Sequence, residues 1–216
     1  MKKKIVIFDL DGTLLDTLED LTDSVNFMLK KFNYPLKSLP QVRDFLGNGV
    51  SVLIKKSLPE CITEVEYNNC IQEFKNHYNL NKYNKTAPYH NIIPMLKYLK
   101  NNNYIVAVVS NKFDIAVKEL CEKYFGDLID MALGENEAEG IRRKPYPDSV
   151  LKILQEYNIS KSEALYSGDS EVDIQTAKNC GIDCVSVTWG FKSKDFLLKS
   201  GARNLIDTPM EILKYC

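Results

Sequence analysis

The chain has 216 residues, of which 44% are hydrophobic and 26% are charged, as in a globular protein with a sizeable core. Its formal net charge of -1 favours neither nucleic acid nor an anionic membrane as the main partner. No apolar run approaches the roughly 20 residues that a membrane span needs. The six cysteines form no Cys-x-x-Cys pair, so a zinc site is not indicated. Without a secretion signal, we expect reduced thiols and a cytoplasmic location.

The first predicted strand is the apolar run IVIF at residues 5–8, which has the composition of a strand buried on both faces. Two acidic residues, Asp9 and Asp11, follow it, and Gly12 then permits a sharp turn. Ligands of open α/β sheets bind at the carboxyl ends of strands, where two carboxylates repel unless a cation or a proton shift compensates. The stretch therefore indicates a metal site or a carboxylate nucleophile, but a turn rich in Asp and Gly explains it equally well.

Residues 16–85 follow a helical pattern. In DTLEDLTDSVNFMLKKF, which begins at residue 16, apolar side chains recur at steps of three and four residues. Three further helices are expected at residues 40–46, 50–58 and 65–78. The last of them places Val65, Phe74 and Tyr78 on one face. We therefore expect a small helical bundle, followed by a polar connector.

From residue 92 onward, helical and strand patterns alternate. Strands are expected at residues 104–112, 128–134, 163–168 and 183–190, with helical segments between them. Such alternation is typical of an α/β fold with a parallel sheet. We therefore predict an α/β protein with a Rossmann-like parallel sheet core and an inserted all-helical domain. The core comprises residues 1–14 and 89–216, and the insert comprises residues 15–88.

Polar residues that suit phosphoryl transfer follow three of the predicted strands. Because parallel strands place their carboxyl ends at one edge of the sheet, we expect these groups to meet. They are Asp9 and Asp11 after the strand at 5–8, Ser110, Asn111 and Lys112 at the end of the strand at 104–112, and Asp169 with Asp173 after the strand at 163–168. A lysine, Lys144, lies in a loop stiffened by two prolines. Carboxylates are ligands that Mg²⁺ prefers, and hydroxyl and ammonium groups donate to phosphoryl oxygens.

Four short motifs in this order resemble those of the haloacid dehalogenase superfamily of aspartate-dependent phosphatases. They are DLDGT from Asp9, SNK from Ser110, KP from Lys144 and GDSEVD from Gly168. The resemblance covers essentially the whole chain, and the helical insert lies where one class of the superfamily has its cap domain. It implies a Mg²⁺-dependent phosphatase that acts through an aspartyl-phosphate intermediate.

The resemblance also implies a role for each motif residue. Asp9 resembles the nucleophile, and Asp11 resembles the general acid–base, whose backbone carbonyl also contacts the metal. Asp169 resembles a direct Mg²⁺ ligand, and Asp173 an acid that orients water or Lys144. The transferring phosphoryl group would be held by Ser110 and Lys144.

Other details resemble the phosphoglycolate phosphatase group, so 2-phosphoglycolate is the leading expected substrate. The group's features are a lysine directly after SN, the cap stretch GNG, and the stretch TWGF at residues 188–191. PYHN, at residues 88–91, departs from the group's pattern, in which a second proline and a glycine are expected. The expected substrate contacts are Asn111, Lys112, Gly47, Asn48 and Gly49. For Lys112, an ordinary solvated lysine is an equally good interpretation, and Trp189 and Phe191 are expected to pack rather than to bind substrate.

Several alternatives stay open on sequence alone. A phosphosugar mutase of the same fold would carry a histidine soon after the first motif, and LLDTLEDLTDSVN has none. Inorganic pyrophosphate and nucleoside monophosphates are alternative substrates. A non-catalytic phosphate-binding module is expected to lack Asp9 or Asp11. The expected partner is a small phosphorylated metabolite, and a monomer and a homodimer fit the sequence equally well. His77 and His90 are not expected to be catalytic.

Overall fold

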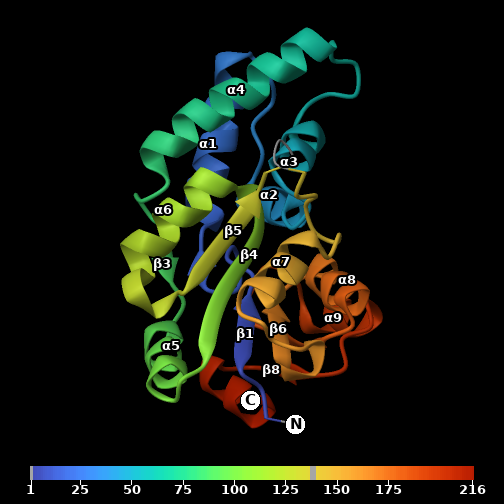
Figure 1. The fold of residues 1–216 in the computed structure, drawn as a ribbon. Coiled ribbons are helices and arrows are strands. Elements are labelled where there is room, and N and C mark those ends of the chain that lie inside the picture. Colours follow the sequence, from blue (N-terminus) through green and yellow to red (C-terminus); the bar gives the residue numbers. More distant parts are fainter. Residues whose placement is uncertain (1, 137–139) are drawn as a thin grey trace. The chain divides into compact units, whose positions relative to one another are not determined.

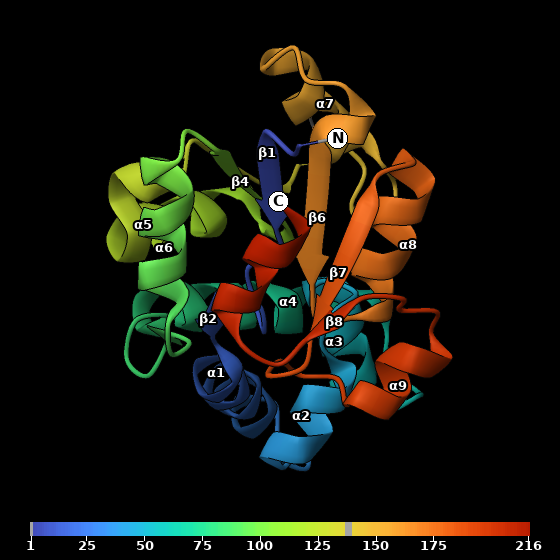
Figure 2. The same cartoon turned by 90° about the horizontal axis from the view of Figure 1, so that it is seen from below.

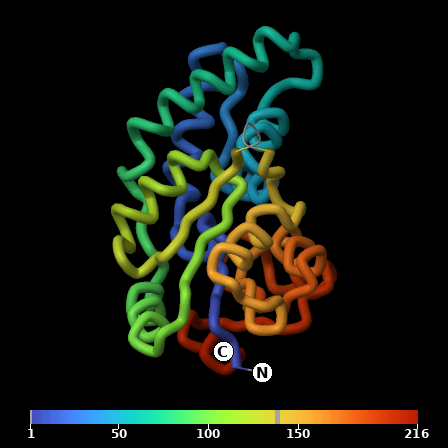
Figure 3. Tube along the Cα trace, in the orientation of Figure 1, coloured from blue at the N-terminus to red at the C-terminus, as the bar shows by residue number. Residues whose placement is uncertain are grey.

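The computed structural model describes residues 2–136 and 140–216. The chain forms two compact units. Met1–Leu15 and Pro88–Cys216 make up the first unit, and Asp16–Ala87 make up the second. Figure 3 follows the chain as it leaves the first unit after its first strand and returns to it after the helices of the second. The second unit is thus one continuous stretch inserted into the first.

Within the described residues, the first unit contains a six-stranded sheet in the order β5-β4-β1-β6-β7-β8, with every neighbouring pair parallel (Figure 1). The strands are β1 (Ile5–Phe8), β4 (Ile105–Phe113), β5 (Met131–Glu135), β6 (Ala164–Gly168), β7 (Asp183–Val187) and β8 (Leu205–Ile206). Both β1 and β6 are buried along their whole length, as expected for strands covered on both faces. The predicted α/β class with a parallel Rossmann-like sheet is confirmed.

Helices connect these strands. They are α5 (Ile92–Asn101), α6 (Asp114–Phe125), α7 (Asp148–Glu156), α8 (Glu171–Cys180) and α9 (Lys194–Lys199), with the 3₁₀ helices η1 (Gly126–Leu128), η3 (Lys161–Glu163) and η4 (Pro209–Tyr215). Figure 2 shows α5 and α6 on one side of the first unit and α7 and α8 on the other. This arrangement follows from the strand order. From β1 the chain first adds β4 and β5 on one side, and it then crosses to the other side of β1 and adds β6, β7 and β8.

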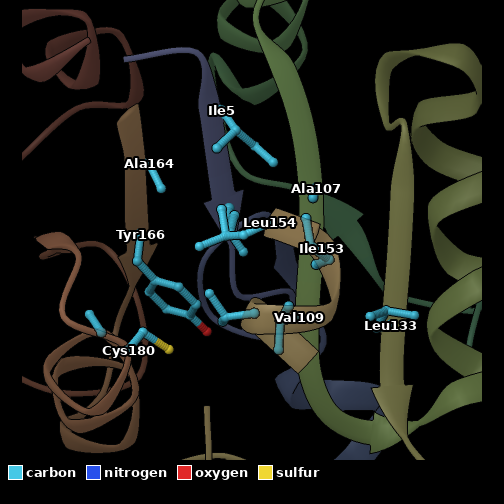
Figure 4. Packing of buried hydrophobic residues seen from close by; sticks show 12 residues of the cluster. Ile5, Ala107, Val109, Leu133, Ile153, Leu154, Ala164, Tyr166 and Cys180 are labelled. Atoms are coloured by element: carbon cyan, nitrogen blue, oxygen red, sulfur yellow. The ribbon is translucent and has the colours of Figure 1, made fainter. Parts of the chain in front are cut away.

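The core on one face of the sheet is a cluster in which α7 and α8 pack against β1, β4 and β6 (Figure 4). Ile5, Ile153 and Tyr166 are completely buried in it. The phenol of Tyr166 brings a polar atom into this apolar layer, and a buried hydroxyl needs a hydrogen-bond partner. That partner lies at the carboxyl end of the sheet.

The second unit, in its described residues, is helical apart from the ends where it joins the first. Its helices are α1 (Leu18–Lys31), α2 (Leu39–Phe45), α3 (Val50–Ser57) and α4 (Glu64–Asn81), and the joining strands β2 (Leu15–Asp16) and β3 (Ala87–Pro88) pair with each other. Phe74 and Tyr78 are buried as predicted, but Val65 is 70% exposed. The prediction for Val65 was wrong: Val65 lies in the first turn of α4, beside the capping box of Thr63 and Glu66, where the neighbouring residues are exposed as well.

The chain after residue 190 contains elements that the sequence pattern did not predict. Helix α9 has six residues and strand β8 has two. Neither is long enough to show a hydrophobic period. Among the described residues, no helix combines the length and apolar character needed to cross a bilayer.

Candidate active site

Asp9 lies at the end of the central strand β1 and is buried. Its Oδ1 accepts a hydrogen bond from the backbone N–H of Leu10 at 2.7 Å and lies 2.8 Å from Nζ of Lys144. The loop that follows turns at Gly12, which has a φ of 83°. A Cβ atom at this position would collide with the Asp169 carboxylate. Glycine therefore allows the first acidic loop to approach the second closely.

Lys144 connects two carboxylates. Its ammonium lies 2.8 Å from Asp9 Oδ1 and 2.7 Å from Asp173 Oδ1, and its side chain is 3% exposed. Burial by itself would lower the pKa of Lys144, but the charges of Asp173 and Asp9 outweigh it, so the pKa is raised. The lysine is therefore a permanent cation at the end of the sheet.

The Asp173 carboxylate is saturated with hydrogen bonds. Besides the bond to Lys144, it accepts from the Tyr166 hydroxyl at 3.2 Å and from the backbone N–H and the hydroxyl of Ser170 at 3.1 and 2.6 Å. Burial, then repulsion by Asp173 and Asp9, raises the pKa of Tyr166 well above its usual value, so the phenol remains a donor. The first turn of α8 thus fixes Asp173 in one orientation.

Asp169, at the end of β6, completes an acidic cluster. Asp9, Asp169 and Asp173 each offer a carboxylate oxygen, and these atoms lie within 4.8 Å of one another. Burial, followed by repulsion from Asp173, raises the pKa of Asp9 to about 7, although Lys144 opposes this. Burial and the neighbouring charges of Asp173 and Asp9 raise the pKa of Asp169 well above its usual value. Hard oxygen ligands with too little positive charge around them fit a divalent cation such as Mg²⁺.

The residues at the end of β4 lie at the same end of the sheet. Lys112 is 5% exposed, and its ammonium lies 3.0 Å from Oδ1 of Asp11. The Ser110 hydroxyl accepts a hydrogen bond from the backbone N–H of Lys112 at 3.2 Å. Asn111, also buried, bonds to the backbone of Lys144. The structure therefore brings the predicted residues of all four motifs together within the first unit.

The predicted substrate contacts in the insert lie within the second unit, between α2 and α3. Gly47 and Gly49 have φ values of 112° and 84°, which favour glycine, and Gly49 caps the start of α3. His77, in the same unit, lies 3.0 Å from the Ser24 hydroxyl through Nδ1. Burial is the main cause that lowers its pKa.

Sequence reasoning missed the contribution of the loop after β7. The backbone N–H of Phe191 donates to Asp169 Oδ2 at 2.6 Å, and the indole N–H of Trp189 donates to the carbonyl of Thr13 at 3.0 Å. Gly190, between them, leaves no room for a Cβ beside Asp169. The predicted strand at 183–190 included most of TWGF, but β7 ends at Val187, so this stretch forms a loop at the carboxyl end of the sheet, where loops approach a ligand site.

Comparison with known proteins gives a consistent result. The family model described as "Haloacid dehalogenase-like hydrolase" matches residues 6–187. A phosphoglycolate phosphatase from Haemophilus influenzae (strain 86-028NP) is 33% identical over 196 residues, which cover 87% of each chain. Phosphoglycolate phosphatase 1 from Pseudomonas aeruginosa is 30% identical over 97% of this chain and 78% of its own length. A crystal structure from Lactobacillus delbrueckii subsp. bulgaricus, provisionally assigned as a phosphoglycolate phosphatase, superposes with a TM-score of 0.94 at 35% identity, covering 100% of this chain and 98% of the other.

Proposed function

Because the chain belongs to the haloacid dehalogenase-like hydrolases, we propose that it is a Mg²⁺-dependent phosphatase of small phosphate monoesters, with 2-phosphoglycolate as its substrate. The observation that carries the proposal is the Asp9 carboxylate, which belongs to the acidic cluster with Asp169 and Asp173 and pairs with the Lys144 ammonium. An oxygen nucleophile, a fixed cation and a set of metal ligands are the parts that phosphoryl transfer needs. The names of the relatives supply the choice of substrate.

In the proposed reaction, an oxygen of Asp9 attacks phosphorus as the bond to the leaving oxygen breaks. Asp11 gives its proton to that oxygen, and the organic alcohol departs. Asp11 then takes a proton from water, which attacks the phosphorus of the aspartyl-phosphate, so that phosphate is released and Asp9 is restored. The Ser110 hydroxyl and the Lys144 ammonium hold the phosphoryl oxygens in both steps.

The metal ion would be held by the side chains of Asp9 and Asp169 and by the backbone carbonyl of Asp11. When bound, Mg²⁺ supplies charge neutralisation between the carboxylate nucleophile and the phosphoryl oxygens. Asp173 belongs to the same cluster, but its oxygens already accept bonds from Lys144, Tyr166 and Ser170. These bonds support a role for Asp173 in orienting Lys144 rather than in binding the metal.

Apart from Lys112, the four motifs act on the phosphoryl group that every candidate substrate carries, so the choice among substrates is proposed to come mainly from outside these motifs. We assign this choice to residues 15–88 as a cap domain, with Gly47, Asn48 and Gly49 as contacts to the organic group, and to Lys112. Backbone N–H groups of a glycine-containing loop suit a small anion. The partner is then a small phosphorylated metabolite. The six cysteines, all within the described part of the chain, are free, which supports a reducing compartment such as the cytoplasm.

The test is release of phosphate by the purified protein with Mg²⁺ over a panel of phosphate esters. The panel contains 2-phosphoglycolate, phosphosugars, nucleoside monophosphates, pyrophosphate and p-nitrophenyl phosphate. We expect the highest kcat/KM for 2-phosphoglycolate. Turnover of none of them would refute the phosphatase assignment, and a preference for another member would replace the substrate while keeping the reaction class.

The loop of the second unit gives a separate prediction. We expect Asn48→Ala and Gly49→Leu to lower kcat/KM for 2-phosphoglycolate by about tenfold more than for p-nitrophenyl phosphate, since one lost polar contact is worth about 1 kcal/mol or more. The leucine also strains a backbone with positive φ, but a loss of folded protein lowers both rates alike. Asn48→Ala avoids this strain. Equal losses for the two substrates would show that the loop merely connects α2 and α3.

A further inference from the structure

The side chain of Asn111 forms two hydrogen bonds to the backbone of one residue, Lys144. The backbone N–H of Lys144 donates to Asn111 Oδ1 at 2.7 Å, and Asn111 Nδ2 donates to the carbonyl oxygen of Lys144 at 3.1 Å. Both residues are buried, with 5% and 4% of their surface exposed. The amide therefore occupies the place that a neighbouring strand would take beside Lys144.

This pairing fixes the orientation of the amide. Turning the amide over would place two donors face to face and two acceptors face to face, so only one orientation satisfies both backbone groups. A buried backbone group without a partner costs about 1–3 kcal/mol. Asn111 thus anchors the stretch of chain that carries Lys144 directly to the end of β4.

The anchor lies next to the reacting groups. The side chain of Lys144 spans from this anchored backbone to Asp9 and Asp173, at 2.8 and 2.7 Å. Two other side-chain contacts of the loop lie at its surface: Arg142 pairs with Asp148, and the exposed Asn179 donates to the carbonyl of Pro145 at 2.8 Å. The buried bonds to Asn111 hold the backbone of Lys144 itself, from which the side chain extends to Asp9 and Asp173.

We propose that Asn111 is a positioning residue for Lys144. The sequence pattern instead predicts a contact between Asn111 and the substrate. The inference rests on the proposed phosphatase function and adds a specific role for the second residue of the SNK motif. Asn111 holds the backbone of Lys144 so that the ammonium reaches Asp9 and the phosphoryl group together. Its effect is then the same for every phosphate ester, because each carries the same phosphoryl group.

The first test compares two substrates that share only the phosphoryl group, 2-phosphoglycolate and p-nitrophenyl phosphate. We expect Asn111→Ala to lower kcat by about 100-fold for both, the loss that a displacement of about 1 Å at a reacting group can cause. The ratio of the two kcat/KM values stays unchanged. Asn179→Ala serves as the matched control, because it removes a hydrogen bond from a side-chain amide to the backbone of Pro145, the residue after Lys144. We expect it to change kcat by less than about twofold.

The second test separates positioning from a general loss of structure. If Asn111 acts through Lys144, then Asn111→Ala added to Lys144→Met lowers the residual turnover of p-nitrophenyl phosphate no further. A loss of folded protein would instead lower the double variant by the same factor as the single one. Circular dichroism monitors folding, and Asn111→Ser replaces the alanine variant if that one does not fold.

The outcomes distinguish the possibilities. Losses that differ between the two substrates would return Asn111 to the substrate-contact role and overturn the inference. If Asn111→Ala lowers turnover in the Lys144→Met variant as much as in the original protein, the inference is overturned and Asn111 has a structural role. Failure of the unaltered protein to hydrolyse either ester would refute the proposed function itself, and the inference with it.

Discussion

Asp9→Asn abolishes turnover while the fold persists. An amide has the same size as the carboxylate and accepts the same bond from the backbone N–H of Leu10, but it cannot form the bond to phosphorus. Loss of a nucleophile from an active site lowers kcat by on the order of 10⁴-fold or more. The measurement is phosphate release from 2-phosphoglycolate and p-nitrophenyl phosphate at saturating Mg²⁺.

The control for this variant is Asp127→Asn, which makes the same change at an exposed position in η1 and leaves kcat unchanged. Thermal unfolding of both variants shows whether the fold is kept. The Asp9 variant unfolds at a temperature no lower than the original protein at neutral pH, because the substitution removes a buried charge whose ionisation is disfavoured by burial and by Asp173. Substantial turnover by folded Asp9→Asn protein would eliminate the aspartyl-phosphate mechanism.

Removal of the divalent metal lowers kcat as much as the Asp9→Asn substitution does. The proposed ligands Asp9 and Asp169 belong to a cluster of three buried acids, and within the described residues the Lys144 ammonium is the cation that pairs with this cluster. Chelator therefore stops phosphate release and added Mg²⁺ restores it. Ca²⁺ inhibits, because it accepts longer bonds and more ligands than Mg²⁺ and so misplaces the nucleophile. Full activity in chelator, or robust activity with Ca²⁺ alone, contradicts the metal assignment.

The same prediction has a readout that does not need catalysis. Without metal, the pKa of Asp9 is raised to about 7, so the neutral acid stabilises the fold below its ordinary pKa and this contribution is lost as pH rises through about 7. A bound cation requires the ionised form and reverses this loss. The increase in unfolding temperature caused by Mg²⁺ is therefore larger at about pH 8 than at about pH 5. An equal increase at both pH values counts against Asp9 as a ligand.

Much of the first unit could be predicted because its strands are apolar runs that end in polar residues. The run IVIF and the acids after it, together with the ends of the strands at Ser110 and Asp169, were sufficient to place one charged cluster at one edge of a parallel sheet. The class of fold follows from the same alternation. These features depend on local pattern and on a general rule of parallel sheets, so no coordinates are needed for them.

The features that escaped prediction depend on contacts between distant parts of the chain. Phe191 acts on Asp169 through its backbone N–H, which every residue other than proline possesses, so the side chain gives no hint of it. The amide of Asn111 faces a backbone 33 residues away, and its partner cannot be read from the motif itself. The short elements α9 and β8 likewise depend on packing rather than on a period.

The position of β1 at the centre of the sheet has a consequence during protein synthesis. Ile5 pairs with Ile105 on one side and with Ala164 on the other, so both partners of this strand are made much later than the strand itself. At a rate of about 5–20 residues per second, an apolar strand waits about 5–20 s for the first of them. Lysines precede the run IVIF and aspartates follow it, and such charges discourage an unpaired strand from joining another nascent chain. We therefore expect Asp9 and Asp11 to lower the tendency of the unpaired strand to aggregate before the active site has formed.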